Sequence, residues 1–365
     1  MARSESVRFG IIGCAKIARK FCRAIYLAPN ATLVALSSRS ISKAREFKSV
    51  NNLPDTVAIY GDYESVLNDS CVDAVYIPLP TSLHLKWSVA AAEKKKHVLL
   101  EKPVALSVDE FDVILEACAA NGVQFMDCTM WMHHPRTEKM KEIISDPSRF
   151  GDVKMVHSTF TFLVDSHFLQ DNIRVKSNLD SLGCLGDVGW YSIRSILWAY
   201  NYRSPKTVIA NPNPIFNESG VPLSCGACIT WEDGNQGTFH CSFLAHFTMT
   251  LGITGTRGTI HLNDFALPFE EASSFFSLAT DCGFPDLPTH WKSLPSKHVV
   301  NTDLPQEARL IAEFSKLVTN IEDNGGKPEK EWPDITRKTQ LVLDAVLASI
   351  RNDCTPIHIT GWDKY

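Results

Sequence analysis

The sequence predicts an α/β protein of two domains: an N-terminal doubly wound parallel sheet and a C-terminal α+β domain with a large, open, mostly antiparallel sheet. Three observations lead to this prediction. The 365 residues suffice for two domains that each bury a core. Short apolar runs alternate with helical patterns over the first third of the chain. Beyond residue 128 strands follow one another directly, so we expect the domains at 1–128 and 129–365.

In the first domain, continuous apolar runs rich in β-branched residues predict buried strands, and the patterns between them predict helices. A serine at residue 107, with a glutamate three positions later, indicates a capped start for the last helix. The expected strands are 7–12, 32–37, 58–60, 74–78, 97–101 and 123–126, and the expected helices are 16–27, 42–50, 82–94 and 107–121.

In the second domain we expect strands at 154–162, 227–231, 236–243, 249–254 and 258–262, with hairpin turns at 231–235 and 254–258. Weak periodicity and several prolines predict a long surface excursion at 263–304. Two late helices, 306–324 and 334–350, are expected to pack back on the first domain. The free face of the sheet predicts a homodimer.

Composition excludes several classes of protein. The 36 basic residues against 41 acidic ones give a formal net charge of −5, which argues against nucleic acid as a partner. No apolar run reaches the roughly 18 residues of a membrane span, and the polar start indicates no signal peptide, so we expect a cytoplasmic protein. Among the 11 cysteines, Cys225 and Cys228 form one C-x-x-C pair with no second pair at zinc spacing. We therefore expect free, structural thiols and no metal.

The first strand runs into Gly13-Cys14-Ala15-Lys16-Ile17 and then a helix. This is the position of the G-x-G-x-x-G/A turn in a Rossmann domain, where small residues bring backbone N–H groups to a pyrophosphate. The middle position is Ala15 instead of glycine, and the alternative is a plain tight turn. We expect these five residues to bind a dinucleotide.

The end of the second strand indicates which dinucleotide binds. An NAD site would carry a carboxylate there for the ribose 2′-hydroxyl, whereas this chain has Ser38, Arg39 and Ser40, with Lys43 one turn further on. Cations and hydroxyls suit a 2′-phosphate. The expected cofactor is therefore NADP(H).

Two further segments carry a family resemblance: 78–84, reading PLPTSLH, and 100–103, reading LEKP. With the segment 183–191 they resemble the Gfo/Idh/MocA oxidoreductases, in particular the branch of NADP-dependent dihydrodiol and D-xylose dehydrogenases, as a plant-like member. The resemblance implies that Lys102 faces the substrate and the nicotinamide ribose, and that the bond to Pro103 is cis. It also implies cofactor contacts from Pro78, Leu79, Pro80, Thr81, His84, Glu101, Lys102 and Pro103.

Segment 183–191, reading GCLGDVGWY, opens a helix on which Asp187 and Tyr191 share one face. Its glycines would let the helix start approach a flat nicotinamide ring. The resemblance implies that the last position is the general acid or base, so Tyr191 would exchange a proton with the substrate. A tyrosine ordinarily titrates near pH ~10, so Lys102 would stabilise the phenolate. Asp187 would orient the substrate or balance Lys102.

Substrate contacts are predicted for Trp131, His133, Arg174, Asp187 and Trp190. Either Arg174 or Arg136 could contact a polar substrate, and the sequence leaves this choice open, together with the roles of His133 and His134. Trp131, Phe162, His167, Phe168 and Trp190 would give a more aromatic pocket than a pure sugar site requires.

These features predict an NADP(H)-dependent dehydrogenase or reductase that interconverts a secondary alcohol and a carbonyl on a sugar, cyclic polyol or dihydrodiol, with catalytic residues Tyr191, Lys102 and Asp187. One alternative is an NADPH-dependent reductase of an aromatic or terpenoid ketone, enone or iminium, suggested by the aromatic residues. The other is a non-catalytic NADP-sensing protein, which would need none of the three catalytic side chains.

Overall fold

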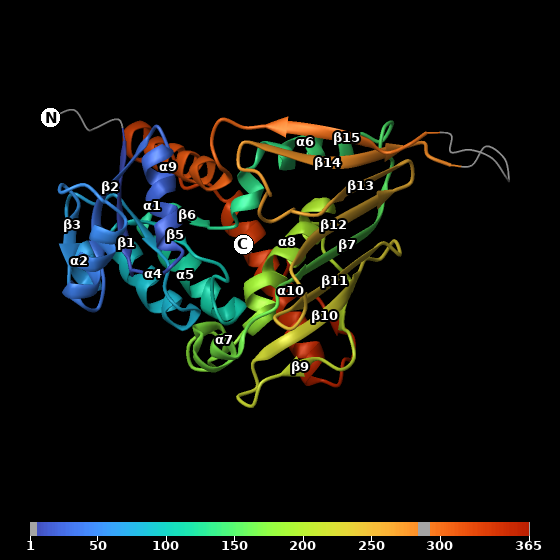
Figure 1. Ribbon diagram of the computed structural model, residues 1–365, viewed down its shortest axis with the longest axis horizontal. Helices are drawn as coiled ribbons and strands as arrows, with labels where there is room; N and C mark the ends of the chain where they lie inside the picture. The colour runs from blue at the N-terminus through green and yellow to red at the C-terminus, as the bar shows by residue number, and fades with distance from the viewer. Residues whose placement is uncertain (1–5, 284–292, 365) are drawn as a thin grey trace. The chain divides into compact units, whose positions relative to one another are not determined.

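The computed structural model describes residues 6–283 and 293–364. The chain divides into two compact units, each made of two segments. The first unit comprises Met1–Met130 and Leu304–Arg337, and the second comprises Trp131–Asp303 and Lys338–Tyr365. Figure 1 labels many of the elements of both units.

The first unit is built on a six-stranded parallel sheet in the order β3-β2-β1-β4-β5-β6, which confirms the doubly wound sheet. Every residue of β4 and β5 is buried, as expected for strands covered on both faces. The strands are β1 Val7–Ile12, β2 Ala31–Ser37, β3 Ala58–Tyr60, β4 Ala74–Ile77, β5 His97–Leu100 and β6 Phe125–Asp127. The helices are α1 Ala18–Leu27, α2 Ile41–Val50, α3 Tyr63–Asn68, α4 His84–Glu93, α5 Val108–Asn121 and α9 Gln306–Asn324, with a 3-10 turn at Thr81–Leu83.

The predicted cap of α5 is present, because the Ser107 side chain accepts a hydrogen bond from the Glu110 backbone N–H at 3.3 Å. Helix α9, the first of the two late helices, belongs to this unit. It packs on α1, where Lys20 Nζ lies 3.1 Å from Glu307 Oε1, and its Phe314 ring lies 6.0 Å from that of Phe9 on β1. The short helix α3 was not predicted.

The second unit contains a ten-stranded sheet in the order β15-β14-β13-β12-β7-β11-β10-β8-β16, with β9 paired to β10. All its pairs are antiparallel except β7 with β11, which confirms the large, mostly antiparallel sheet. Helix α8 packs on one face, against β7 and β11 (Figure 1). The strands are β7 Val153–Thr161, β8 Thr207–Ala210, β9 Ile215–Phe216, β10 Pro222–Thr230, β11 Gln236–Ser242, β12 Thr248–Gly255, β13 Gly258–Leu262, β14 Ser273–Thr280, β15 Ser296–Asn301 and β16 Ile357–His358. The helical segments are a 3-10 turn Met130–His133, α6 Pro135–Ile144, α7 Ser166–Asp171, a 3-10 turn Ile173–Val175, a π-helical turn Leu185–Gly189 and α8 Trp190–Ala199. The division between the units falls within α10, Glu331–Arg351.

The prediction of a surface excursion at 263–304 is wrong for the described part of that segment. Strands β14 and β15 lie there and extend the sheet beyond β13. Side chains alternate between a buried and an outward face along β14, and Pro268 and Pro295 flank these strands without interrupting them. The remaining prolines of the segment fall at 284–292, outside the described residues.

No helix among the described residues has the length and apolar character needed to cross a membrane. All eleven cysteines are free thiols.

Candidate active site

The turn after β1 has a geometry that glycine alone permits. Gly13 has a φ of 114°, and its N–H donates to the Ser37 carbonyl at the end of β2 at 3.0 Å. A Cβ at Gly13 would lie 2.7 Å from Leu79 Cδ2 in the loop after β4. No side chain caps the N-terminus of α1, which follows this turn. A close-packed backbone turn before an uncapped helix fits the pyrophosphate of a dinucleotide.

The side chains predicted to bind a 2′-phosphate lie together at the end of β2. Arg39, Ser40 and Lys43 are exposed, whereas Ser38 is buried and its N–H donates to the Tyr60 carbonyl at 3.2 Å. The Ser40 hydroxyl caps α2 by accepting from the Lys43 N–H at 3.4 Å. Two exposed cations beside a helix N-terminus fit a phosphate with two negative charges.

His84, a predicted cofactor contact, is buried and joins two loops. Its Nε2 lies 2.9 Å from the Leu79 carbonyl oxygen, and its Nδ1 lies 3.2 Å from that of Val104. Burial lowers the pKa of His84 to about 4, so the ring is neutral at pH 7 and its single N–H donates to one of these two carbonyls. The structure therefore gives His84 a supporting position between the loops after β4 and β5, with its ring nitrogens directed at the protein backbone.

Glu101 fixes the backbone beside Lys102. One carboxylate oxygen accepts from the Tyr76 hydroxyl at 2.6 Å, and the other accepts from the Lys102 N–H at 3.1 Å. Burial and the nearby Glu101 carboxylate raise the pKa of Tyr76 well above its ordinary value, so this tyrosine stays a donor. The bond from Lys102 to Pro103 is cis, as the resemblance implied.

In the second unit, Asp187 and Arg174 form an ion pair at the π-helical turn. Arg174 Nε lies 2.9 Å from Asp187 Oδ2, with the Asp187 side chain 11% exposed and that of Arg174 36% exposed. The Arg174 backbone N–H donates to the Asn172 side chain at 3.0 Å, which holds this residue in its own short helical turn. A π-helical turn is uncommon and is frequently found at functional sites.

Tyr191 follows this turn at the start of α8. It is 6% exposed, and its ring centroid lies 5.7 Å from that of Phe160 on β7. The structure therefore places Arg174, Asp187 and Tyr191 around one helix start, with Lys102 on the other unit.

Packing explains why two positions of the segment 183–191 are glycine. A Cβ at Gly183 would lie 2.1 Å from the Pro222 carbonyl oxygen, and one at Gly189 would lie 3.1 Å from Cys241 Sγ. The space they leave is filled by β10 and β11. Gly183 and Gly189 thus serve packing of the turn on its own sheet, and the approach of a nicotinamide ring to the helix start stays a prediction.

The two predicted tryptophans are core residues of the second unit. Trp131 is 1% exposed and packs edge-on against Trp198, with the ring centroids 5.5 Å apart. Trp190 is fully buried, and the Arg194 guanidinium lies 5.5 Å from its ring. His133 is buried as well. Substrate contacts from these three residues stay a prediction, although their burial accounts for them as packing.

Burial distinguishes Arg136 from Arg174, the two arginines predicted as alternative substrate contacts. Arg136 is 1% exposed and held by Asp264, with Nη1 2.6 Å from Asp264 Oδ1. The neighbouring His134 caps α6 by accepting from the Arg136 N–H at 2.9 Å. Both residues are thus engaged inside the second unit, and Arg174 is the arginine that lies beside Asp187.

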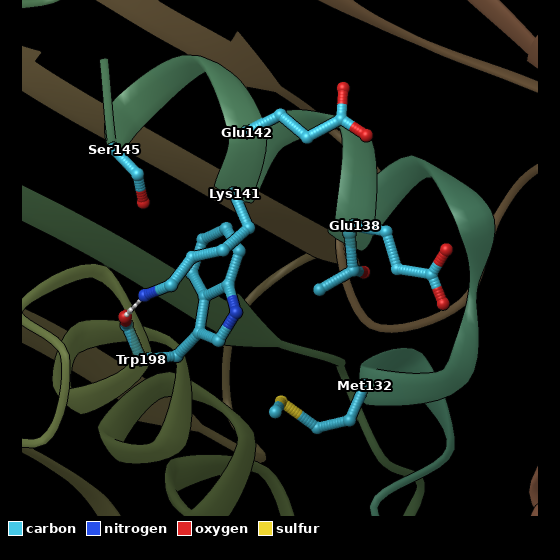
Figure 2. A pocket seen from close by; sticks show the side chains of 7 residues that line it. Met132, Glu138, Lys141, Glu142, Ser145 and Trp198 are labelled. Atoms are coloured by element: carbon cyan, nitrogen blue, oxygen red, sulfur yellow. Dashed lines mark hydrogen bonds between the residues drawn. The ribbon is translucent and has the colours of Figure 1, made fainter.

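A pocket of about 350 Å³ between α6 and α8 contains none of the predicted residues (Figure 2). Lys141 Nζ donates to the Trp198 carbonyl there at 2.7 Å, and burial lowers the pKa of Lys141 to about 8. The pocket is lined by Met132, Thr137, Glu138, Lys141, Glu142, Ser145 and Trp198. Nothing in the sequence distinguishes Lys141 from any other lysine of an amphipathic helix, so this pocket could not be predicted.

Two family models match the chain. Residues 7–127 match the oxidoreductase family with an NAD-binding Rossmann fold, and residues 137–261 match the GFO/IDH/MocA C-terminal domain.

Named relatives include D-xylose 1-dehydrogenase (NADP(+)) 2 of Haloferax volcanii, which is 31% identical over 75% of this chain and 81% of that protein. Trans-1,2-dihydrobenzene-1,2-diol dehydrogenase of Sus scrofa is 24% identical over 71% of this chain and 75% of its own length. Among solved structures, KijD10, a 3-ketoreductase from Actinomadura kijaniata in complex with NADP and TDP-benzene, superposes with a TM-score of 0.80 at 23% identity. The match covers 94% of this chain and 97% of that one. This last likeness concerns the fold.

Proposed function

The chain belongs to the Gfo/Idh/MocA family of oxidoreductases, and we propose that it interconverts a secondary alcohol and a carbonyl on a sugar, cyclic polyol or dihydrodiol, with Tyr191 exchanging the proton. The enzyme is an NADP-dependent dehydrogenase or reductase of CH–OH or C=O groups. Its relatives include a D-xylose 1-dehydrogenase (NADP(+)) and a trans-1,2-dihydrobenzene-1,2-diol dehydrogenase. The observation that carries the proposal is the grouping of Arg174, Asp187 and Tyr191 around one π-helical turn.

The residues of the first unit fit NADP(H). We propose that the turn 13–17 binds the pyrophosphate and that Ser38, Arg39, Ser40 and Lys43 surround the 2′-phosphate. When bound, this cofactor supplies or accepts the hydride of the reaction. The contacts proposed from the loops after β4 and β5 are those of Pro78, Leu79, Pro80, Thr81, His84, Glu101, Lys102 and Pro103, with His84 and Glu101 acting through the backbone that they hold.

Tyr191 is proposed as the proton donor in reduction and the acceptor in oxidation. A phenol needs a lowered pKa to give and take a proton at neutral pH, and the Lys102 ammonium is proposed to supply the charge that lowers it. Asp187 is proposed to orient a substrate hydroxyl by accepting its hydrogen bond. Arg174 holds that carboxylate in a fixed position through their ion pair.

The aromatic alternative loses part of its basis, because Trp131 and Trp190 are enclosed in the core of the second unit. Phe162 and Phe168 are half-buried and pack on one another, with ring centroids 6.0 Å apart. We therefore place sugars, polyols and dihydrodiols ahead of aromatic or terpenoid ketones.

We further propose that the outward face of the ten-stranded sheet binds a second copy of the chain. On the described strands this face carries many threonines, such as Thr159, Thr250 and Thr254. Lys297 is a charged residue on this face, and Phe275 and Val299 are exposed beside it. A broad sheet face with so little charge is typical of a subunit interface. Cytoplasmic localisation stays a prediction.

A screen for cofactor turnover in both directions tests the proposed reaction. The purified chain is incubated with NADP⁺ and a panel of pentoses, hexoses, inositols and dihydrodiols, and with NADPH and the matching ketones plus aromatic and terpenoid carbonyls, while absorbance follows the cofactor. We expect turnover in the sugar or diol group. Turnover confined to aromatic or terpenoid carbonyls would support the alternative reductase, and tight NADPH binding without turnover on either panel would support a sensor.

A further inference from the structure

Three cysteine thiols converge behind the π-helical turn of the second unit. Cys184 directly precedes the turn, while Cys225 on β10 and Cys241 on β11 are opposite partners in the antiparallel register. Cys241 Sγ lies 3.5 Å from Cys225 Sγ and 3.9 Å from Cys184 Sγ, and all three sulfurs lie within 4.8 Å of one another. All three side chains are buried.

These distances match the geometry of a thiolate site. Around one ion at a metal–sulfur distance of about 2.3 Å, the sulfurs of three thiolates lie roughly 4 Å apart. The sulfurs come from three separate segments, and the fold brings them to that spacing without a disulfide between them. A buried thiol that serves packing alone needs no such convergence, as Cys118 in α5 illustrates.

We propose that Cys184, Cys225 and Cys241 form a site for one soft d¹⁰ cation, for which copper(I) is the best match. Thiolates select copper(I) and zinc among the common metals. A structural zinc takes four ligands, whereas the ligand group found among the described residues contains these three cysteines and is buried from water. Three thiolates suit copper(I), which is satisfied by three-fold coordination.

Binding exchanges thiol protons for the cation and releases them to solvent, with no change in the oxidation state of sulfur or metal.

The three cysteines lie beside the proposed catalytic turn, so an ion bound to them would affect that turn. Cys184 is three residues before Asp187, and the Cβ position of Gly189 lies 3.1 Å from Cys241 Sγ. An ion bound to all three sulfurs would tie this turn to β10 and β11. A ligand that binds the folded state alone also raises the thermal midpoint of unfolding.

The experiment titrates the reduced full-length chain with copper(I) against a competing chelator, and in a separate arm with zinc(II). Native mass spectrometry gives the stoichiometry, and near-ultraviolet absorption reports thiolate-to-copper charge transfer. We expect one copper(I) per chain and a raised thermal midpoint. Cys184→Ser, Cys225→Ser and Cys241→Ser should each weaken binding at least tenfold, whereas the matched control Cys118→Ser should bind as the unaltered chain does.

If a serine variant fails to fold, the corresponding alanine variant replaces it, because alanine brings no hydroxyl into the core. Equal binding by the unaltered chain and by the three variants would overturn the proposal, as would failure to retain either ion. Zinc bound in place of copper through the same cysteines would support the thiolate site and overturn the preference for copper(I). Binding is measured without turnover, so the outcome is independent of the proposed reaction.

Discussion

The Arg174 guanidinium holds the Asp187 carboxylate at 2.9 Å, and this ion pair links a 3-10 turn to the π-helical turn that leads into α8. The carboxylate is largely buried, whereas the arginine is partly open to solvent. A largely buried carboxylate is costly to keep charged when a cation beside it is removed, so the pair should be sensitive to removal of either member.

Arg174→Ala should lower kcat/KM by about 10- to 100-fold, because Asp187 loses the partner that fixes its charge and position. Asp187→Asn should have an effect of similar size, and the double variant should lose little more than either single one. Steady-state kinetics with the best substrate of the screen measure all three. The control is Arg203→Ala, which breaks the exposed pair with Asp233, also at 2.9 Å, and should leave kcat/KM within twofold. Additive losses in the double variant would contradict a functional pair.

Tyr191→Phe should lower kcat by two or more orders of magnitude and leave the NADPH dissociation constant nearly unchanged, since the hydroxyl is proposed to serve the substrate oxygen alone. Fluorescence titration gives the cofactor affinity and initial rates give kcat. Tyr26→Phe, which alters a tyrosine 84% exposed on α1, is the matched control. Activity close to that of the unaltered chain in Tyr191→Phe would remove the tyrosine from the proposed role.

Arg39→Ala should reduce the preference for NADPH over NADH about 10- to 100-fold, because one charge-assisted contact to the 2′-phosphate is lost while the rest of the turn is retained. The ratio of kcat/KM for the two cofactors is the measurement. Arg45→Ala changes another exposed arginine, on α2, and should leave the ratio as it is. An unchanged ratio in Arg39→Ala would place the 2′-phosphate elsewhere.

His84 predicts a pH dependence of stability. Its folded pKa of about 4 lies below the ordinary value of ~6.5, so the folded state binds fewer protons than the unfolded state between these values. The contribution of the neutral ring is complete above pH ~6.5 and is lost as the pH falls toward 4, by an amount on the order of 3 kcal/mol. Urea denaturation between pH 7.5 and 4.5 should show a shallower loss for His84→Gln than for the unaltered chain. The exposed His246→Gln is the control, and equal slopes for all three proteins would contradict the assignment.

The double variant Thr159→Glu with Thr250→Glu should convert the proposed dimer into a monomer. The two residues lie opposite one another on β7 and β12, and in a symmetric dimer the added carboxylates would face those of the second subunit and repel them. Light scattering after size exclusion measures the mass. Ser49→Glu, on the exposed side of α2, should leave the mass unchanged. A monomeric unaltered chain would refute the proposed interface directly.

The sequence was informative where local rules decide the structure. Strands such as β4 and β5 are continuous apolar runs, and the Ser107 cap places the start of α5 within one residue. The glycine turn at Gly13 was predicted from its place between a strand and a helix, and its positive φ agrees with that reading.

Contacts between distant segments could not be predicted in the same way. Tyr76 lies in an apolar run that reads as core, and nothing near it in sequence indicates that its hydroxyl holds Glu101, 25 residues further on. From the sequence, Gly183 and Gly189 were predicted to leave space for a ligand. The strands that pack against these two glycines come later in the chain, so their contact could not be foreseen locally. Likewise the segments of β14 and β15 were predicted to be a loop, because the sequence of each strand does not indicate the strand with which it pairs.

The supports of Lys102 have a consequence for how the enzyme can be changed. His84 lies between the loops after β4 and β5 with its ring nitrogens close to backbone carbonyls of both, and Glu101 accepts from the Lys102 N–H. Arg39 and Ser40 after β2, and Lys43 in α2, are exposed. Substitutions at those exposed positions remove none of the bonds that hold the loops. With the 2′-phosphate proposed to bind at those positions, cofactor preference could drift, in evolution or in engineering, while the lysine keeps its place.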